Sequence, residues 1–180
     1  MKFSVNQKDL QQSLGFCQGV IEKRSTLPIL SNILLEAYNS KLKITATDLD
    51  LIFINEINDV EVIEEGKTTT TSSTLYDIIR KFSSGKKINF NLTTENKIQL
   101  ESEKSVFNLN CMSADEFPLM EENFTENEFV LKSKQFLKLL SKCKFSISTD
   151  ETRHYLSGIY FHQTQVDDKH YLTAAATDSH

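Results

Sequence analysis

Hydrophobic residues along the chain recur with two different periods, and the change between them predicts the order of the first elements. Phe3 and Val5 alternate with polar residues, as in a strand. The apolar residues that follow recur at steps of three and four, as on one side of a helix: Leu10, Leu14, Cys17 and Ile21. Three short apolar runs then predict strands at 29–35, 42–44 and 51–57.

The same order follows once more. Val60 and Val62 predict a strand, and a threonine-rich link leads to a helix with an apolar side made of Leu75, Ile78, Ile79 and Phe82. Further strands are predicted at 88–92, 98–100 and 107–109. Because each helix has one apolar side, both helices must cover a common sheet surface. The predicted fold class is α+β, with an internal βαβββ pseudo-repeat.

The beginning of this pattern occurs again at an offset of 126 residues. Nine of 33 positions are identical when residues 3–35 are laid on residues 129–161, whereas unrelated sequences would give about two. After a short insertion, Ala46-Thr47-Asp48 meets Ala176-Thr177-Asp178. Such self-similarity indicates an array of like domains.

The repeat predicts two domains. Residues 1–125 form a complete first domain, and residues 126–180 form the first half of a second, truncated domain. The second copy is expected to contain a strand at 129–131, a helix at 133–143 and strands at 156–161 and 171–175. By analogy with the first domain, the second copy lacks its closing strand and its whole second half, so we interpret the chain as an incomplete fragment.

Composition indicates a folded cytoplasmic protein. The 180 residues are 39% hydrophobic and 25% charged, which excludes a disordered chain. The longest apolar stretch, 29–35, is too short to cross a membrane, and the N-terminus lacks the apolar core of a signal peptide. The three cysteines are odd in number and widely separated, as expected for reduced thiols.

The net charge of −5 argues against nucleic-acid binding, but the charges are unevenly distributed. Residues 111–128 carry six acids and neither lysine nor arginine. The acidic stretch 113–128 is the expected linker between the two domains. Residues 129–148 carry five lysines and no acid. Because the local field decides where a polyanion binds, a protein with one basic element can still hold nucleic acid.

Three of these lysines, Lys134, Lys138 and Lys142, stand at i, i+4 and i+8 on the predicted helix, opposite its apolar side. A solvated helix face normally mixes both signs, because opposite charges four residues apart attract. A stripe of one sign suits phosphate groups instead. Both interpretations stay open: an ordinary solvated face and a surface that contacts nucleic acid.

Two loops are further candidates for such contacts. Arg24 follows the first helix, and the segment 150–155 follows the third. A loop with arginine, histidine and tyrosine can touch phosphate and stack on bases, but ordinary loop composition explains it equally well.

Motifs of catalysis and metal binding are missing from the sequence. It contains no glycine-rich phosphate loop, no His-Glu-x-x-His and no Cys-x-x-Cys spacing. His154, His162 and His170 fall eight residues apart, and we interpret them as solvent-exposed. We therefore expect no active site, no metal and no cofactor.

Five short segments form an ordered set along the chain: 23–30 (KRSTLPIL), 46–49 (ATDL), 114–118 (ADEFP), 153–158 (RHYLSG) and 176–180 (ATDSH). Together they resemble the bacterial DNA sliding clamp family, the beta subunit of the replicative DNA polymerase III. The resemblance implies a DNA-clamp fold, in which each domain packs two helices on paired antiparallel sheets. It also implies a non-enzymatic processivity factor. Two full-length chains of three domains each would form a homodimeric ring around double-stranded DNA, and DNA polymerase and clamp-loader subunits would dock through short peptide motifs.

The resemblance also assigns roles to single residues. Arg24 lies where the family has a DNA-contacting arginine, and Asp150, His154 and Tyr155 lie where it has a glutamine and two tyrosines that touch DNA. Asp150 and His154 are departures from that pattern. Arg153 and the three lysines complete the expected DNA-binding set.

Other positions match surfaces for protein partners. Part of the cleft that holds the partners' peptide motif corresponds to Leu156, Thr177, Ser179 and His180, with Ser179 where the family usually has glycine. Phe107 matches an aromatic residue of the dimer interface. The alternative function is a stand-alone nucleic-acid-binding module, which would bind duplex DNA tightly as a monomer with a steep dependence on salt.

Overall fold

The computed structural model describes residues 1–21, 27–93, 96–119 and 130–179. Contacts between Cα atoms divide the chain into two compact units, Met1–Glu122 and Asn123–His180. None of the helices in these described ranges is both long and apolar enough to span a lipid bilayer.

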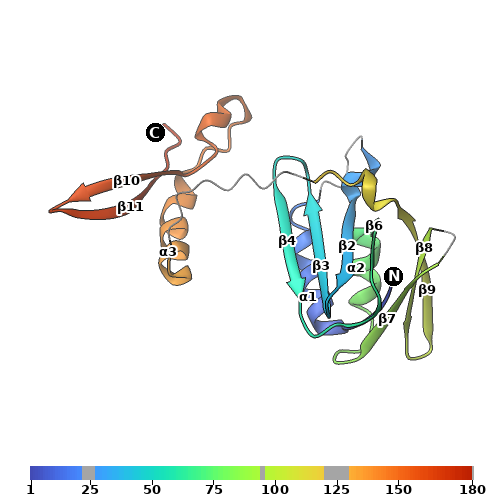
Figure 1. Cartoon of the computed structure of the whole chain (residues 1–180). Coiled ribbons are helices and arrows are strands. Elements are labelled where there is room, and N and C mark those ends of the chain that lie inside the picture. The colour runs from blue at the N-terminus through green and yellow to red at the C-terminus, as the bar shows by residue number, and fades with distance from the viewer. Residues whose placement is uncertain (22–26, 94–95, 120–129, 180) are drawn as a thin grey trace. The chain divides into compact units, whose positions relative to one another are not determined.

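The first unit combines strands with two α-helices (Figure 1). In chain order its elements are β1 (Lys2–Asn6), α1 (Gln7–Cys17), a 3-10 turn (Pro28–Ser31), β2 (Asn32–Tyr38), β3 (Lys41–Thr47), β4 (Ile52–Ile57), β5 (Glu61–Glu64), β6 (Gly66–Thr71), α2 (Ser72–Ile79), β7 (Lys87–Leu92), β8 (Lys97–Ser102), β9 (Ser105–Met112) and a second 3-10 turn (Ala114–Glu116).

All of its strands join one antiparallel sheet in the order β4-β3-β2-β6-β9-β8-β7-β1-β5. The order contains an exchange. β1 opens the first half but pairs with β7 of the second, and β6 opens the second half but pairs with β2 of the first. Each half reads strand, helix and three strands, which confirms the α+β class and the internal repeat.

One strand of the repeat lies elsewhere than the sequence predicts. The threonine-rich stretch is β6 rather than a link, and the strand predicted at Val60 and Val62 is the additional edge strand β5, which pairs with β1. Threonine is β-branched and favours strands. The strand β6 lies between β2 and β9, and three of its threonines are buried there: Thr68, Thr69 and Thr70. Because threonine carries a hydroxyl group, a search for apolar periodicity does not detect this strand.

Both helices lie on the same face of the sheet and pack against each other, which Figure 1 shows behind β2, β3 and β4. Their inward side chains are fully buried: Leu10, Leu14 and Cys17 from α1, and Leu75 and Ile79 from α2. α1 ends at Cys17, four residues earlier than the apolar stripe suggests. The strand predicted from residue 29 begins at Asn32, because Pro28 opens a 3-10 turn.

The second unit holds α3 (Ser133–Cys143), 3-10 turns at Lys144–Ser146 and Glu151–Leu156, and the antiparallel hairpin of β10 (Tyr160–Val166) and β11 (Lys169–Ala175). α3 packs on β11, and the ring of Phe136 stacks on Phe161 with centroids 5.8 Å apart. The apolar pattern of residues 133–143 predicts that Leu137 points inward, but its side chain is 62% exposed.

Two strand predictions in this unit are wrong in part. Val130 and Leu131 lie in no strand, and Phe129 lies outside the described residues. In the first unit the equivalent strand, β1, pairs only with β5 and β7, whose counterparts are not among the described residues of the second unit. The strand predicted from Leu156 begins at Tyr160, because 3-10 turns occupy Glu151–Leu156.

The buried position of Leu14 gives a test of this core. We expect Leu14→Ala to lower the free energy of unfolding of the first unit by about 2–5 kcal/mol, since the truncation leaves a cavity between α1 and the sheet. Leu51→Ala removes the same atoms from a side chain that is 53% exposed and should cost less than about 0.5 kcal/mol. Urea denaturation followed by circular dichroism measures both values, and equal losses would contradict the packing.

Candidate nucleic-acid and peptide-binding surface

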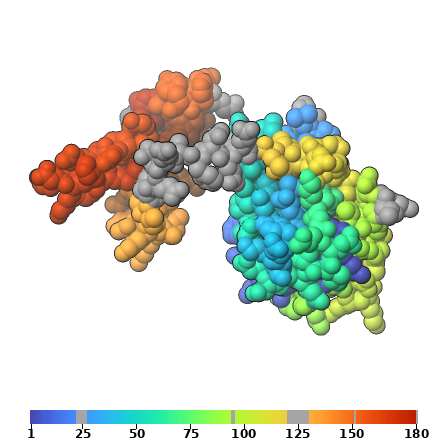
Figure 2. Space-filling model, in the orientation of Figure 1, coloured from blue at the N-terminus to red at the C-terminus, as the bar shows by residue number. Residues whose placement is uncertain are grey.

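The lysine stripe of α3 is solvent-exposed. Lys134, Lys138 and Lys142 follow one another at one-turn spacing, and all three side chains are exposed. None of the three ammonium groups has an acidic partner within salt-bridge distance among the described residues. Figure 2 shows the surface of α3 in orange, with much of the helix facing solvent. Among the described residues of its unit, the stripe is therefore a row of positive charges without an acidic partner.

Asp150 organises the loop that follows α3. One carboxylate oxygen accepts hydrogen bonds from the backbone N–H of Thr152 at 2.9 Å and from its hydroxyl at 2.6 Å. The other oxygen accepts from Arg153 Nε at 2.9 Å. Hydrogen bonds from the Thr152 hydroxyl, the Thr152 amide and Arg153, in that order of importance, lower the pKa of the Asp150 carboxyl. Its charge is thus used within the loop, to hold the 3-10 segment Glu151–Leu156.

Two rings project from this segment. His154 and Tyr155 are both exposed, and their ring centroids lie 6.1 Å apart in an edge-on arrangement. Tyr155 is 73% exposed. Exposed aromatic rings next to a positively charged helix have the geometry on which nucleic-acid bases stack.

Arg153 extends from the same segment to the end of β11. Its Nη1 donates to Ser179 Oγ at 2.7 Å and to the carbonyl oxygen of Asp178 at 3.5 Å. Together with the bond from Nε to Asp150, these contacts use two of the three guanidinium nitrogens within the second unit. Nη2 forms no hydrogen bond to the described residues and remains a possible donor to phosphate.

A hollow of about 220 Å³ lies between the loop and the end of the hairpin. It is lined by Tyr155, Leu156, Gly158, Tyr160, Ala175, Ala176 and Thr177. Two residues expected in a peptide cleft, Leu156 and Thr177, therefore lie on one surface. Most of the lining is apolar, and a small apolar recess with few polar groups suits a hydrophobic side chain of a peptide.

Ser179 is fixed in the turn that follows Thr177, a lining residue of this hollow. Its backbone N–H donates to Thr177 Oγ1 at 3.0 Å, and its φ of 70° lies in the left-handed region. Glycine adopts such a φ without strain, which explains why glycine is expected at this position by resemblance. His180 and Arg24 lie outside the described residues.

Phe107 lies on β9, where its ring meets Phe82 edge-on with centroids 5.8 Å apart. β9 pairs with β8 over its length, but with β6 only at Cys111 and Met112. The edge of β9 near Phe107 is therefore open, and the side chain is 39% exposed. An open strand edge beside an exposed aromatic ring is a suitable place for another chain to pair.

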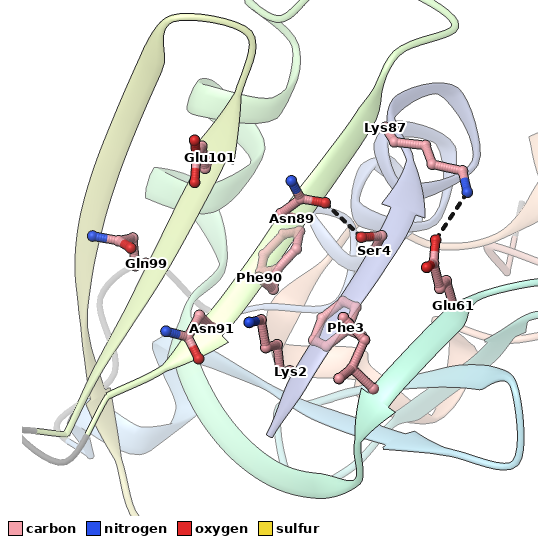
Figure 3. Close-up of a pocket in the computed structure, with 11 residues that line it drawn as sticks. Lys2, Phe3, Ser4, Glu61, Lys87, Asn89, Phe90, Asn91, Gln99 and Glu101 are labelled. Carbon is pink, nitrogen blue, oxygen red and sulfur yellow. Dashed lines mark hydrogen bonds and ion pairs between the residues drawn. The ribbon is translucent and has the colours of Figure 1, made fainter.

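The first unit also contains a polar hollow of about 510 Å³ on the sheet, between β5, β1, β7 and β8 (Figure 3). Ser4 donates to Asn89, and Lys87 forms an ion pair with Glu61 at 3.1 Å. Histidine and cysteine are absent from its lining residues, so the Ser4 hydroxyl has no imidazole base beside it there. Among the described residues no group of three or more histidine, cysteine or acidic side chains could hold a metal ion.

Some residues of the peptide hollow were not found from the sequence. Gly158, Tyr160 and Ala175 line it, and the Asp178 carbonyl accepts from Arg153. The internal repeat carried a signal for Tyr160, which occupies the position of Leu34 at the offset of 126, and Gly158 belongs to the segment 153–158.

Comparisons with known proteins identify the family of the chain. The family model described as the DNA polymerase III beta subunit, N-terminal domain, matches residues 1–121, and the model of its central domain matches residues 130–180. The chain belongs to the DNA polymerase III beta subunit family. Its division into two units follows the two domain models of that family.

Relatives of this family match the whole chain. The chain is 35% identical to the beta sliding clamp of Caulobacter vibrioides and 32% identical to that of Escherichia coli K12, covering 100% of this chain and 48% of each relative. A solved beta sliding clamp from Caulobacter crescentus superposes with a TM-score of 0.95 at 35% identity, covering 100% of this chain and 48% of that one. A Bartonella birtlesii sliding clamp bound to griselimycin gives a TM-score of 0.94 at 37% identity, with the same coverage. The chain thus spans about half the length of the curated relatives it matches.

The hydrogen bonds to Asp150 predict how the loop responds to pH. A carboxyl with a lowered pKa stabilises the folded loop fully above its ordinary value of 3.8, and this stabilisation is lost as the pH falls through the lower folded value. In an NMR titration, the amide resonance of Thr152 should therefore shift with a midpoint below 3.8. The transition should vanish in Asp150→Asn, and a midpoint at or above 3.8 would contradict the hydrogen-bond network.

Proposed function

We propose that the protein is a sliding clamp, the processivity factor of a replicative DNA polymerase, acting without an active site of its own. The observation that carries the proposal is the stripe of Lys134, Lys138 and Lys142, which has no acidic partner among the described residues. In an acidic protein, such a stripe supports contact with a polyanion. Family membership supports double-stranded DNA as that polyanion.

The DNA-contacting surface, on this proposal, consists of the lysine stripe and the loop beside it. The lysines neutralise phosphates along the backbone, and His154 and Tyr155 touch sugar or base surfaces. Asp150 holds the loop, and Arg153 adds a phosphate contact through Nη2. Arg24 stays a predicted DNA contact.

Protein partners would use two other surfaces. The hollow of Leu156 and Thr177 would receive a short peptide motif from polymerase and clamp-loader subunits. Ser179 and His180 stay predicted members of that cleft. Griselimycin, which is bound to the Bartonella birtlesii clamp, would bind there as well. The open edge of β9 beside Phe107 would pair with a second chain, so that two full-length chains close a ring around DNA.

The domain boundary belongs to the same proposal. Residues 1–125 would form a complete clamp domain, and residues 126–180 the first half of a second. The three cysteines are free thiols, which supports a cytoplasmic location.

Neutralising the stripe tests the DNA surface. In the complete protein, the triple variant Lys134→Gln, Lys138→Gln, Lys142→Gln should keep its circular dichroism spectrum, because the three side chains are exposed. Its affinity for duplex DNA should fall, and the slope of log affinity against log salt should decrease by about 3. A control with Lys86→Gln, Lys87→Gln and Lys104→Gln has the same change in charge at exposed positions of the first domain. Equal slopes for both triple variants would contradict the assignment.

Retention on DNA circles distinguishes the ring from a stand-alone binding module. The complete protein, loaded on circular duplex DNA, should stay bound at a salt concentration that abolishes electrostatic binding and should leave when the circle is cut, because a ring can slide off an end. A stand-alone module would dissociate from both forms as salt rises. Retention that does not depend on the circle would favour the module.

A further inference from the structure

Arg153 connects the two parts of the proposed site. Its Nε donates to Asp150, which begins the 3-10 segment carrying Tyr155, and its Nη1 donates to Ser179, in the turn after β11. One guanidinium therefore ties the loop proposed to contact DNA to the turn that follows Thr177, a residue of the peptide hollow.

The connection continues from Ser179 into the hollow itself. The backbone N–H of Ser179 donates to Thr177 Oγ1 at 3.0 Å, and Thr177 lines the hollow together with Tyr155. The guanidinium is planar, with its donors in fixed directions, so it satisfies both acceptors only when the loop and the turn are correctly placed. A lysine ammonium is a point charge on a flexible chain and does not fix two partners in this way.

We propose that Arg153 is a positioning residue that couples DNA binding by the loop to peptide binding in the hollow. The inference rests on the function proposed above and adds a link between its two surfaces. A ligand in the hollow orders the Ser179 turn and, through Arg153 and Asp150, the loop that carries His154 and Tyr155. A second ligand then loses less conformational entropy, so each ligand tightens the binding of the other by the same factor.

The test is a thermodynamic cycle in the complete protein, with griselimycin and a short DNA duplex as the two probes. Griselimycin affinity is measured with and without saturating duplex, and duplex affinity with and without griselimycin. We expect each probe to increase the affinity of the protein for the other probe by about fivefold or more. Because Arg153 also belongs to the proposed DNA surface, the affinity of Arg153→Lys for each probe alone is measured first. The coupling factor is a ratio of two affinities within the same variant, and in Arg153→Lys it should fall to about one. Ser179→Ala should have the same effect from the other end of the connection.

The matched control is Arg80→Lys. Arg80 pairs with Asp77 at 3.2 Å and at the same i,i+3 spacing as Arg153 and Asp150, but it lies in the first unit. This variant should keep the full coupling factor. If both probes bind and the wild-type factor is one or less, or if Arg153→Lys and Ser179→Ala keep the wild-type factor, the inference is wrong and the proposed function stands. If either probe fails to bind the wild-type protein, the proposed function itself fails, and the inference fails with it.

Discussion

The exchange of β1 and β6 between the halves of the first unit is the constraint on which its fold depends. Each half is a helix with strands on one side, and such a unit cannot bury both its helix and its sheet face alone. Because β1 pairs with β7 and β6 pairs with β2, each half completes its sheet with a strand of the other half. α1 and α2 follow directly from the exchanged strands, so the same pairing brings both helices to one face, where they pack on each other.

The two copies of the internal repeat share one local turn but differ in what packs beside it. Thr47 and Thr177 each accept a hydrogen bond at 3.0 Å from the amide two residues later, and those residues, Leu49 and Ser179, both have positive φ. In the first unit, Ile29 and Leu34 pack against Phe117 of the same chain. Their counterparts at the offset of 126, Tyr155 and Tyr160, line the hollow of the second unit. In the first unit, the side chain of Phe117 thus covers this surface. In the second unit, the corresponding surface lines a hollow.

The sequence predicted those features that follow from periodicity. Periodicity in the sequence predicted both helices of the first unit, the lysine stripe of α3 and the strands β7 and β8. In these elements, buried and exposed positions recur every 3.6 or 2 residues. β6 was missed because its buried residues are threonines, and their polarity conceals a strand from a search for apolar residues. The start of β2 was misplaced because the turn at Pro28–Ser31 depends on backbone geometry and not on hydrophobicity.

The candidate site also contains residues that periodicity predicts and residues whose roles depend on the folded structure. Charges on a helix need no partner in order to be recognised, so Lys134, Lys138 and Lys142 could be found from spacing alone. The roles of Asp150 and Arg153 depend on atoms that are close only in the folded chain, since Ser179 lies 26 residues from Arg153. An aspartate that would repel phosphate as an isolated charge becomes an internal acceptor once Thr152 and Arg153 donate to it. Asp150 departs from the pattern expected of a loop that contacts DNA, and in the fold it is the group that holds this loop in place.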